Sequence, residues 1–159
     1  IAVLSAQEAP PRFHSRLNAA RKTYLYRIWN SPVHNVFERK YVYALEQELD
    51  EEAMRRAADR LLGTHDFRAF SSYRRTKKST VRTLERIGIE RRGEELQLSF
   101  TGDGFLYHMV RILAGTLIEV GLHRREPEEM ERILASLDRE QAGFTAPAQG
   151  LCLVSVEYE

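Results

Sequence analysis

Cysteine is nearly absent from this sequence, and its scarcity excludes several kinds of protein. Cys152 is the single cysteine among 159 residues, so the chain can form neither an internal disulfide nor a metal site made of several cysteines. We expect Cys152, which stands in an apolar segment of alternating character, to be a buried thiol of the core. One unpaired cysteine suits a reducing compartment, so we expect a cytoplasmic protein.

Uncharged hydrophobic runs long enough to span a membrane are also missing. The most apolar long stretch, residues 104–121, contains His108, Arg111 and Glu119. Its apolar residues recur every three or four positions, which predicts a buried amphipathic helix and no membrane contact. The spacings of zinc ligands, phosphate-binding glycine loops and nucleophile elbows are absent as well, so we expect neither a metal nor a cofactor.

Acidic residues are missing from two windows, although the net charge is only +1. Residues 9–37 contain five basic and no acidic residues, and residues 67–84 contain six basic and none acidic, together eleven of the 24 lysines and arginines. Two basic stretches on a near-neutral protein indicate a polyanion-binding face, most simply for nucleic acid. Two solvated loops would give the same pattern, so charge alone leaves both interpretations open.

The periodicities predict an α+β fold in which helices cover one face of an antiparallel sheet. We expect a domain over residues 46–159 and, in residues 1–45, N-terminal strands and an RNA-contacting segment that lead into it. Because the chain begins at Ile1 with the strand-like run Ile-Ala-Val-Leu, we also expect it to be a piece of something longer. The expected strands are residues 1–4, 22–29, 41–43, 82–92, 95–100 and 151–158, and the expected helices are residues 50–63, 104–121 and 126–135.

Tyr24 in its strand and Arg111 in its helix are candidate functional residues. Tyr24 lies on the same face of its strand as Tyr26, and such an aromatic row could stack on bases or simply form sheet core. Arg111 lies among small and apolar residues of its helix, where an unpaired buried guanidinium would cost on the order of several kcal/mol. We therefore expect that its side chain either extends to water or has a specific anionic partner. Asp66 and Asp103 are candidates, but neither stands at a helical offset that ensures contact. We expect His108 to be structural.

Five segments closely resemble tRNA pseudouridine synthase A, and together they span nearly the whole chain. They are Phe13-His-Ser-Arg-Leu17, Lys22-Thr-Tyr-Leu-Tyr26, Leu62-Gly-Thr-His-Asp-Phe-Arg-Ala-Phe70, Gly104-Phe-Leu-Tyr-His-Met-Val-Arg111 with Gly115-Thr-Leu-Ile-Glu-Val-Gly121, and Thr145-Ala-Pro-Ala-Gln-Gly-Leu151. The resemblance implies the pseudouridine synthase fold and a cofactor-independent isomerisation of uridine in the anticodon stem-loop of tRNA, at positions 38–40. It also implies a homodimer and an aspartate nucleophile that acts on a base flipped from its stack.

The resemblance further assigns roles to residues. Tyr24 matches the active-site tyrosine that meets the target base, and Arg111 matches the arginine that pairs with the catalytic aspartate. A charge partner of this kind would keep the nucleophile ionised and oriented. The segments that match tRNA-contacting parts of the family are Phe13 to Leu17 and Phe70 to Arg74, and they contain Phe13, His14, Arg16, Phe70, Tyr73 and Arg74. We also expect Arg75, Lys77 and Lys78 of the adjoining basic stretch to bind RNA.

One part of the family pattern is missing. The catalytic aspartate belongs to an Arg-Thr-Asp-Ala-Gly-Val-His-Ala-like motif, and no such motif occurs in these residues. We therefore expect the chain to be a C-terminal portion that requires a missing N-terminal half as its partner and cannot isomerise uridine by itself. The alternative is a non-catalytic RNA-binding α+β module.

Overall fold

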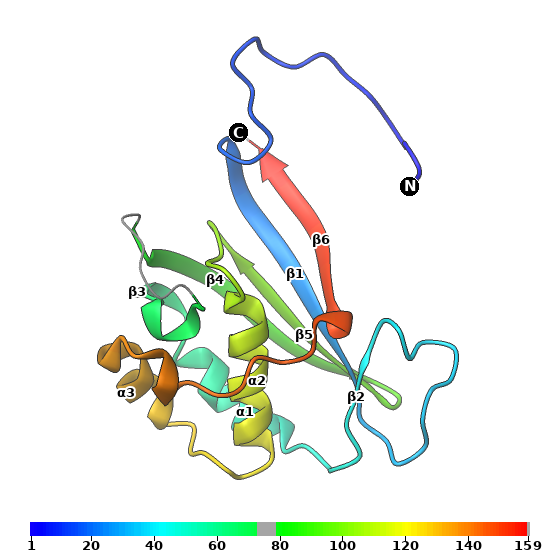
Figure 1. Cartoon of the computed structure of the whole chain (residues 1–159), viewed down its shortest axis with the longest axis vertical. Coiled ribbons are helices and arrows are strands. Elements are labelled where there is room, and N and C mark those ends of the chain that lie inside the picture. The colour runs from blue at the N-terminus through cyan, green and yellow to red at the C-terminus, as the bar shows by residue number, and fades with distance from the viewer. Residues whose placement is uncertain (73–78, 159) are drawn as a thin grey trace.

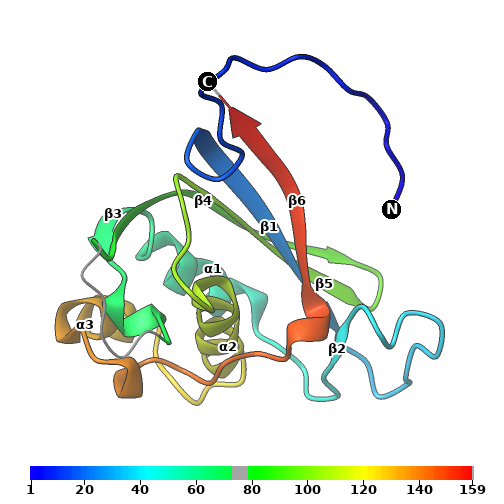
Figure 2. The same ribbon diagram turned by 45° about the horizontal axis from the view of Figure 1, so that its top comes forward.

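The computed structural model describes residues 1–72 and 79–158, and over these residues the chain is an α+β fold with a six-stranded mixed sheet (Figure 1). The helices gather on one face of the sheet and leave the other face uncovered (Figure 2). The strands are β1 Ala19–Trp29, β2 Tyr43–Ala44, β3 Gly63–Asp66, β4 Val81–Arg92, β5 Glu95–Gly102 and β6 Leu151–Tyr158. The helices are α1 Glu51–Asp59, α2 Met109–Gly121 and α3 Glu129–Ser136, with 3-10 turns η1 Arg68–Phe70, η2 Arg139–Gln141 and η3 Ala148–Gly150.

Strand β1 is the axis of the sheet, whose order is β2-β1-β5-β4-β3 with β6 also paired to β1. One edge of β1 pairs with β5 from Lys22 to Trp29. The other edge is shared, because β6 pairs antiparallel with the first part of β1 and β2 pairs parallel with its last two residues. The expected sheet is therefore confirmed in outline, but the β1–β2 pair makes it mixed instead of wholly antiparallel. Strand β1 comes from residues 1–45, while β5 and β6 come from residues 46–159.

The hydrophobic core lies between the sheet and helices α1 and α2. The buried side chains of β1 and β5 alternate along each strand, so that Tyr26 and Ile28 face the helices together with Leu96, Leu98 and Phe100. Helix α2 is buried over most of its length, as the apolar stripe predicted. No helix in the described part of the chain is long and apolar enough to cross a membrane.

Several boundaries differ from the expectations. Residues 1–4 do not form a strand but belong to an exposed N-terminal segment that runs away from the sheet and has no neighbouring strand to pair with (Figure 1). Helix α2 begins at Met109 instead of Gly104, because His108 has a left-handed backbone with φ 60° that a helix cannot continue through. Strand β3, which pairs with β4, was not expected.

The expectation for Cys152 is wrong, because its side chain is exposed. The residue lies opposite Leu25 in the β1–β6 ladder, on the sheet face that no helix covers. Alternating apolar residues predict a strand with a buried face, but they do not say whether that strand lies at an edge of the sheet.

Candidate active site

Arg111 stands at the third position of α2, where the helix meets the segment that leads into β6. Its Nε donates to the carbonyl oxygen of Ala146 at 2.6 Å, and the backbone N–H of Ala146 donates to the carbonyl oxygen of Arg111 at 3.0 Å. The two residues therefore hold each other by a reciprocal pair of hydrogen bonds. The arginine side chain is half-buried, so its charge still reaches solvent.

Close packing brings this segment against α2. A Cβ atom on Gly115 would lie 1.9 Å from the carbonyl oxygen of Phe144, so only glycine permits the approach. The Thr116 hydroxyl accepts from the N–H of Gly143 at 2.9 Å, and Glu119 accepts from the N–H of Phe144 at 3.2 Å. Successive backbone groups of the segment are thus bound to side chains of the helix.

No carboxylate in the described part of the chain pairs with Arg111. The side chain of Asp103 accepts from the N–H of Thr83 at 2.9 Å, and that of Asp66 accepts from the N–H of Arg68 at 3.0 Å. The idea that either aspartate is the partner is therefore wrong. Nε is bound to a carbonyl, and the two terminal nitrogens of Arg111 make no hydrogen bond or ion pair with residues 1–72 or 79–158.

Tyr24 and Tyr26 point to the same face of β1 but have different surroundings. Tyr24 is half-buried and packs edge-to-face on Phe105, with ring centroids 5.1 Å apart. Tyr26 is fully buried, and its hydroxyl donates to the carbonyl oxygen of Pro147 at 2.7 Å. Burial raises the pKa of Tyr26 well above its ordinary value, although the charge of Arg111 acts in the opposite direction. Tyr26 is thus core, while part of Tyr24 remains accessible.

His108 precedes α2 and contacts a second loop. Its Nδ1 lies 3.1 Å from the hydroxyl of Ser72, and burial, with a contribution from Arg111, lowers the pKa of His108.

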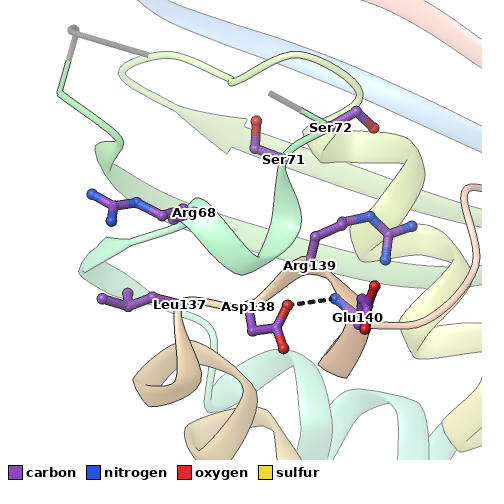
Figure 3. A pocket seen from close by; sticks show the side chains of 7 residues that line it. All are labelled: Arg68, Ser71, Ser72, Leu137, Asp138, Arg139 and Glu140. Atoms are coloured by element: carbon purple, nitrogen blue, oxygen red, sulfur yellow. Dashed lines mark hydrogen bonds between the residues drawn. The ribbon is translucent and has the colours of Figure 1, made fainter. Parts of the chain in front are cut away.

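Ser72 also lines a hollow of about 560 Å³ between η1 and η2 (Figure 3). In that hollow Arg139 donates to the Thr145 hydroxyl at 3.1 Å, and burial lowers the pKa of Arg139. Ser72 lies in the Phe70 to Arg74 segment but was not singled out from the sequence, and neither was Arg139, because neither belongs to a recognisable spacing.

The remaining residues expected at the site lie in different surroundings. Phe13, His14 and Arg16 are exposed just before β1, and the ring of Phe13 lies edge-to-face on Tyr158 at 5.0 Å. Phe70 is fully buried and packs against Phe67, so its ring is not open to RNA. Tyr73, Arg74, Arg75, Lys77 and Lys78 lie outside the described residues. Among the described residues, no group of histidines, cysteines or carboxylates could hold a metal ion.

Comparison with known proteins agrees with the resemblance. A family model described as tRNA pseudouridine synthase matches residues 57–159. The tRNA pseudouridine synthase A 2 of Clostridium tetani is 47% identical over 158 residues, which cover 99% of this chain and 64% of that protein. The tRNA pseudouridine synthase A of Moorella thermoacetica is 48% identical over 158 residues, with the same two shares.

The chain spans less than two thirds of the curated relatives it matches. For the tRNA pseudouridine synthase A of Halalkalibacterium halodurans, 48% identity over 151 residues covers 95% of this chain but 57% of that protein. The matched part is the C-terminal portion of these relatives. With more than half of the chain matched by the family model and nearly all of it by close relatives, this protein belongs to the tRNA pseudouridine synthase family.

Proposed function

We propose that this chain is the C-terminal catalytic portion of a tRNA pseudouridine synthase A, which isomerises uridine to pseudouridine in the anticodon stem-loop of tRNA. The observation that carries the proposal is Arg111, a half-buried guanidinium whose terminal nitrogens have no partner among the described residues. A guanidinium oriented in this way binds a carboxylate through two parallel hydrogen bonds. The parent enzyme is a cytoplasmic homodimer and uses neither a metal nor a cofactor.

The reaction needs a nucleophile and a flipped base. An aspartate of the N-terminal portion attacks the nucleoside, the bond between N1 of uracil and C1′ of the ribose breaks, and the base turns. A bond then forms between C5 and C1′ and the bond to the aspartate breaks, which returns the carboxylate, while C5 loses a proton and N1 gains one. Atoms and electrons balance without an oxidant or a reductant, so carboxylate chemistry is sufficient.

Each residue of the site has a part in this scheme. Arg111 keeps the aspartate ionised, because a neighbouring positive charge lowers the pKa of a carboxyl group. Tyr24, with Phe105 beside it, offers an aromatic wall against which the extruded uracil packs. Exposed Phe13, His14 and Arg16, together with the basic run Tyr73 to Lys78, contact the RNA outside the target nucleotide.

The surface of β6 supports docking of the N-terminal portion. The strand pairs only with β1 over the described residues, so its outer backbone edge is open. Leu153 and Val154 are 49% and 58% exposed, on opposite faces of the strand. An open, apolar edge strand readily accepts another strand. Turn η3 joins β6 to residues 142–147, the segment whose Ala146 is hydrogen-bonded to Arg111. A portion docked on β6 would therefore reach the arginine.

The test is pseudouridine formation in an anticodon stem-loop substrate. The chain is assayed alone and mixed with the N-terminal portion of the Moorella thermoacetica relative, the part that this chain does not match. We expect activity only in the mixture, and loss of at least about 10²-fold with Arg111→Ala, because the carboxylate loses its charge partner.

Other results would change the assignment. Activity of the chain alone would show that the nucleophile lies within these 159 residues. An inactive mixture with tRNA binding that weakens as salt rises would favour a non-catalytic RNA-binding module.

A further inference from the structure

We propose that Tyr26 is a positioning residue, whose buried hydroxyl fixes the direction in which Arg111 presents its terminal nitrogens. The effect passes through the backbone of Ala146 and Pro147. Its catalytic consequence rests on the function proposed above, whereas its structural basis lies within this chain.

A short chain of hydrogen bonds joins the two side chains. The Tyr26 hydroxyl donates to the carbonyl oxygen of Pro147 at 2.7 Å, and Arg111 Nε donates to that of Ala146 at 2.6 Å. These carbonyls belong to consecutive residues. The Ala146 carbonyl lies in the peptide plane that ends at the Pro147 nitrogen, and the proline ring fixes φ of Pro147. A displacement of the Pro147 backbone therefore also shifts the acceptor of Arg111.

Tyr26 is well suited to hold this backbone still. Its ring is fully buried, and its strand is paired on both sides, opposite Leu98 in β5 and Leu151 in β6. Gly150 lies so close that a Cβ there would be 2.9 Å from Cζ of the ring, so the turn before β6 packs directly on the tyrosine. The hydroxyl is therefore fixed by the sheet, and its acceptor by the turn.

The consequence concerns how Arg111 binds a carboxylate. A guanidinium can present either Nε with one terminal nitrogen or both terminal nitrogens to a carboxylate. In this structure Nε is already bound to Ala146, so only the edge formed by the two terminal nitrogens is available. If the Ala146 carbonyl turned away, the other edge would compete, and the aspartate would lose its single orientation.

The first test uses the 159-residue chain alone and asks whether Tyr26 holds the Nε–H of Arg111. Hydrogen exchange at this group is followed by ¹⁵N-edited NMR, and the signal is assigned by its loss in Arg111→Lys. We expect Tyr26→Phe, which removes one oxygen atom and keeps the ring, to accelerate exchange at least about tenfold. A p-aminophenylalanine at position 26 keeps a donor and should restore slow exchange.

Tyr43→Phe is the matched control. Tyr43 also borders this segment, since its ring lies 6.5 Å from that of Phe144. Its hydroxyl makes no hydrogen bond within the part of the chain that the structure describes, so exchange at Arg111 should change less than about twofold. Unchanged exchange in Tyr26→Phe, or equal acceleration in both variants, overturns the proposal.

The second test measures catalysis in the mixture with the N-terminal portion. We expect Tyr26→Phe to lower kcat about tenfold with KM changed less than twofold, because the nucleophile is misoriented while RNA binding is kept. In an Arg111→Lys background, which has no Nε–H to orient, the same change should have no further effect. An equal fall in both backgrounds indicates general damage and overturns the proposal. If the unsubstituted mixture is inactive, the proposed function fails, and the exchange comparison still decides the role of Tyr26.

Discussion

His108 and Arg111 lie at the start of α2, whose first turn contains no acidic residue. Neither has a carboxylate partner among the described residues, and each is bound to a neutral group, a serine hydroxyl for His108 and a backbone carbonyl for Arg111. Burial of the imidazole, and after it the unneutralised guanidinium nearby, disfavour a second positive charge and lower the pKa of His108. The imidazole therefore stays neutral at physiological pH, and the arginine remains the only cation of the pair.

This arrangement predicts a pH dependence of stability. Burial, followed by Arg111, lowers the pKa of His108 below its ordinary value of 6.5. The unfolded chain therefore binds a proton at higher pH than the folded chain does. The contribution of His108 is complete above pH 6.5 and is lost as the pH falls from there through the folded pKa.

Urea unfolding at pH 7.5 and pH 5.5 measures the effect. Asparagine tolerates the left-handed backbone of position 108 and does not titrate, so His108→Asn should lose less stability between the two pH values than the unsubstituted chain. Equal losses in the two proteins would contradict the assignment. The comparison of the two chains removes contributions from other titrating groups that they share.

At the scale of elements, the contact between α2 and residues 142–147 builds the site. Helix α2 contributes Arg111, Gly115 and Thr116 to it, and the extended segment contributes backbone N–H and carbonyl groups. The segment has no strand of its own to pair with, so the helix satisfies its polar groups. Loss of this contact would release the carbonyl that orients Arg111.

Gly115→Ala tests the closeness of this contact. In an open helix the change would add stability, but here the new methyl group would meet the Phe144 carbonyl at 1.9 Å. We expect a loss of about 2 kcal/mol in the free energy of unfolding, because rigid backbone must shift. Gly104→Ala is the control, since its nearest neighbour is the flexible side chain of Arg82 at 3.3 Å, and it should cost less than about 0.5 kcal/mol. Equal costs for the two changes would show that the contact is loose.

At the scale of the whole molecule, the outer edge of β6 is a strand edge without a pairing partner among the described residues. Its neighbour β1 is paired on both edges, while the outer edge of β6 has no strand beside it in the described part of the chain. The exposed apolar side chains of β6 favour pairing of this edge with a strand of another chain. We therefore expect the isolated chain to associate with itself at high concentration.

Val154→Lys tests this expectation. A lysine on an edge strand disfavours further strand addition, so we expect at least about tenfold weaker self-association and equally weakened binding of the N-terminal portion. Sedimentation equilibrium measures both. Val33→Lys, at a valine that is 72% exposed outside the strands, adds the same charge elsewhere. If it weakens association as much as Val154→Lys does, the effect comes from net charge and not from the edge.

Local patterns were enough to predict most elements, and they failed where a distant residue decides the outcome. The apolar stripe predicted α2, and the alternation around Gly93 predicted the β4–β5 hairpin, because both depend on residues close in sequence. The helix start was placed too early because the left-handed backbone of His108 depends on its tertiary surroundings. The exposure of Cys152 was missed because alternation cannot identify an edge strand.

The sequence by itself determined the family of this protein, the identity of Arg111 as an unusual charge in an apolar helix, and the pairing of Tyr24 with Tyr26 on one strand face. Only the tertiary structure decided what those residues do. It gave Arg111 a carbonyl partner 35 positions away, left Tyr24 partly open and buried Tyr26 under η3. The physical reason is that periodicity fixes the direction of a side chain, whereas its partner and its burial depend on segments that meet only in the folded chain.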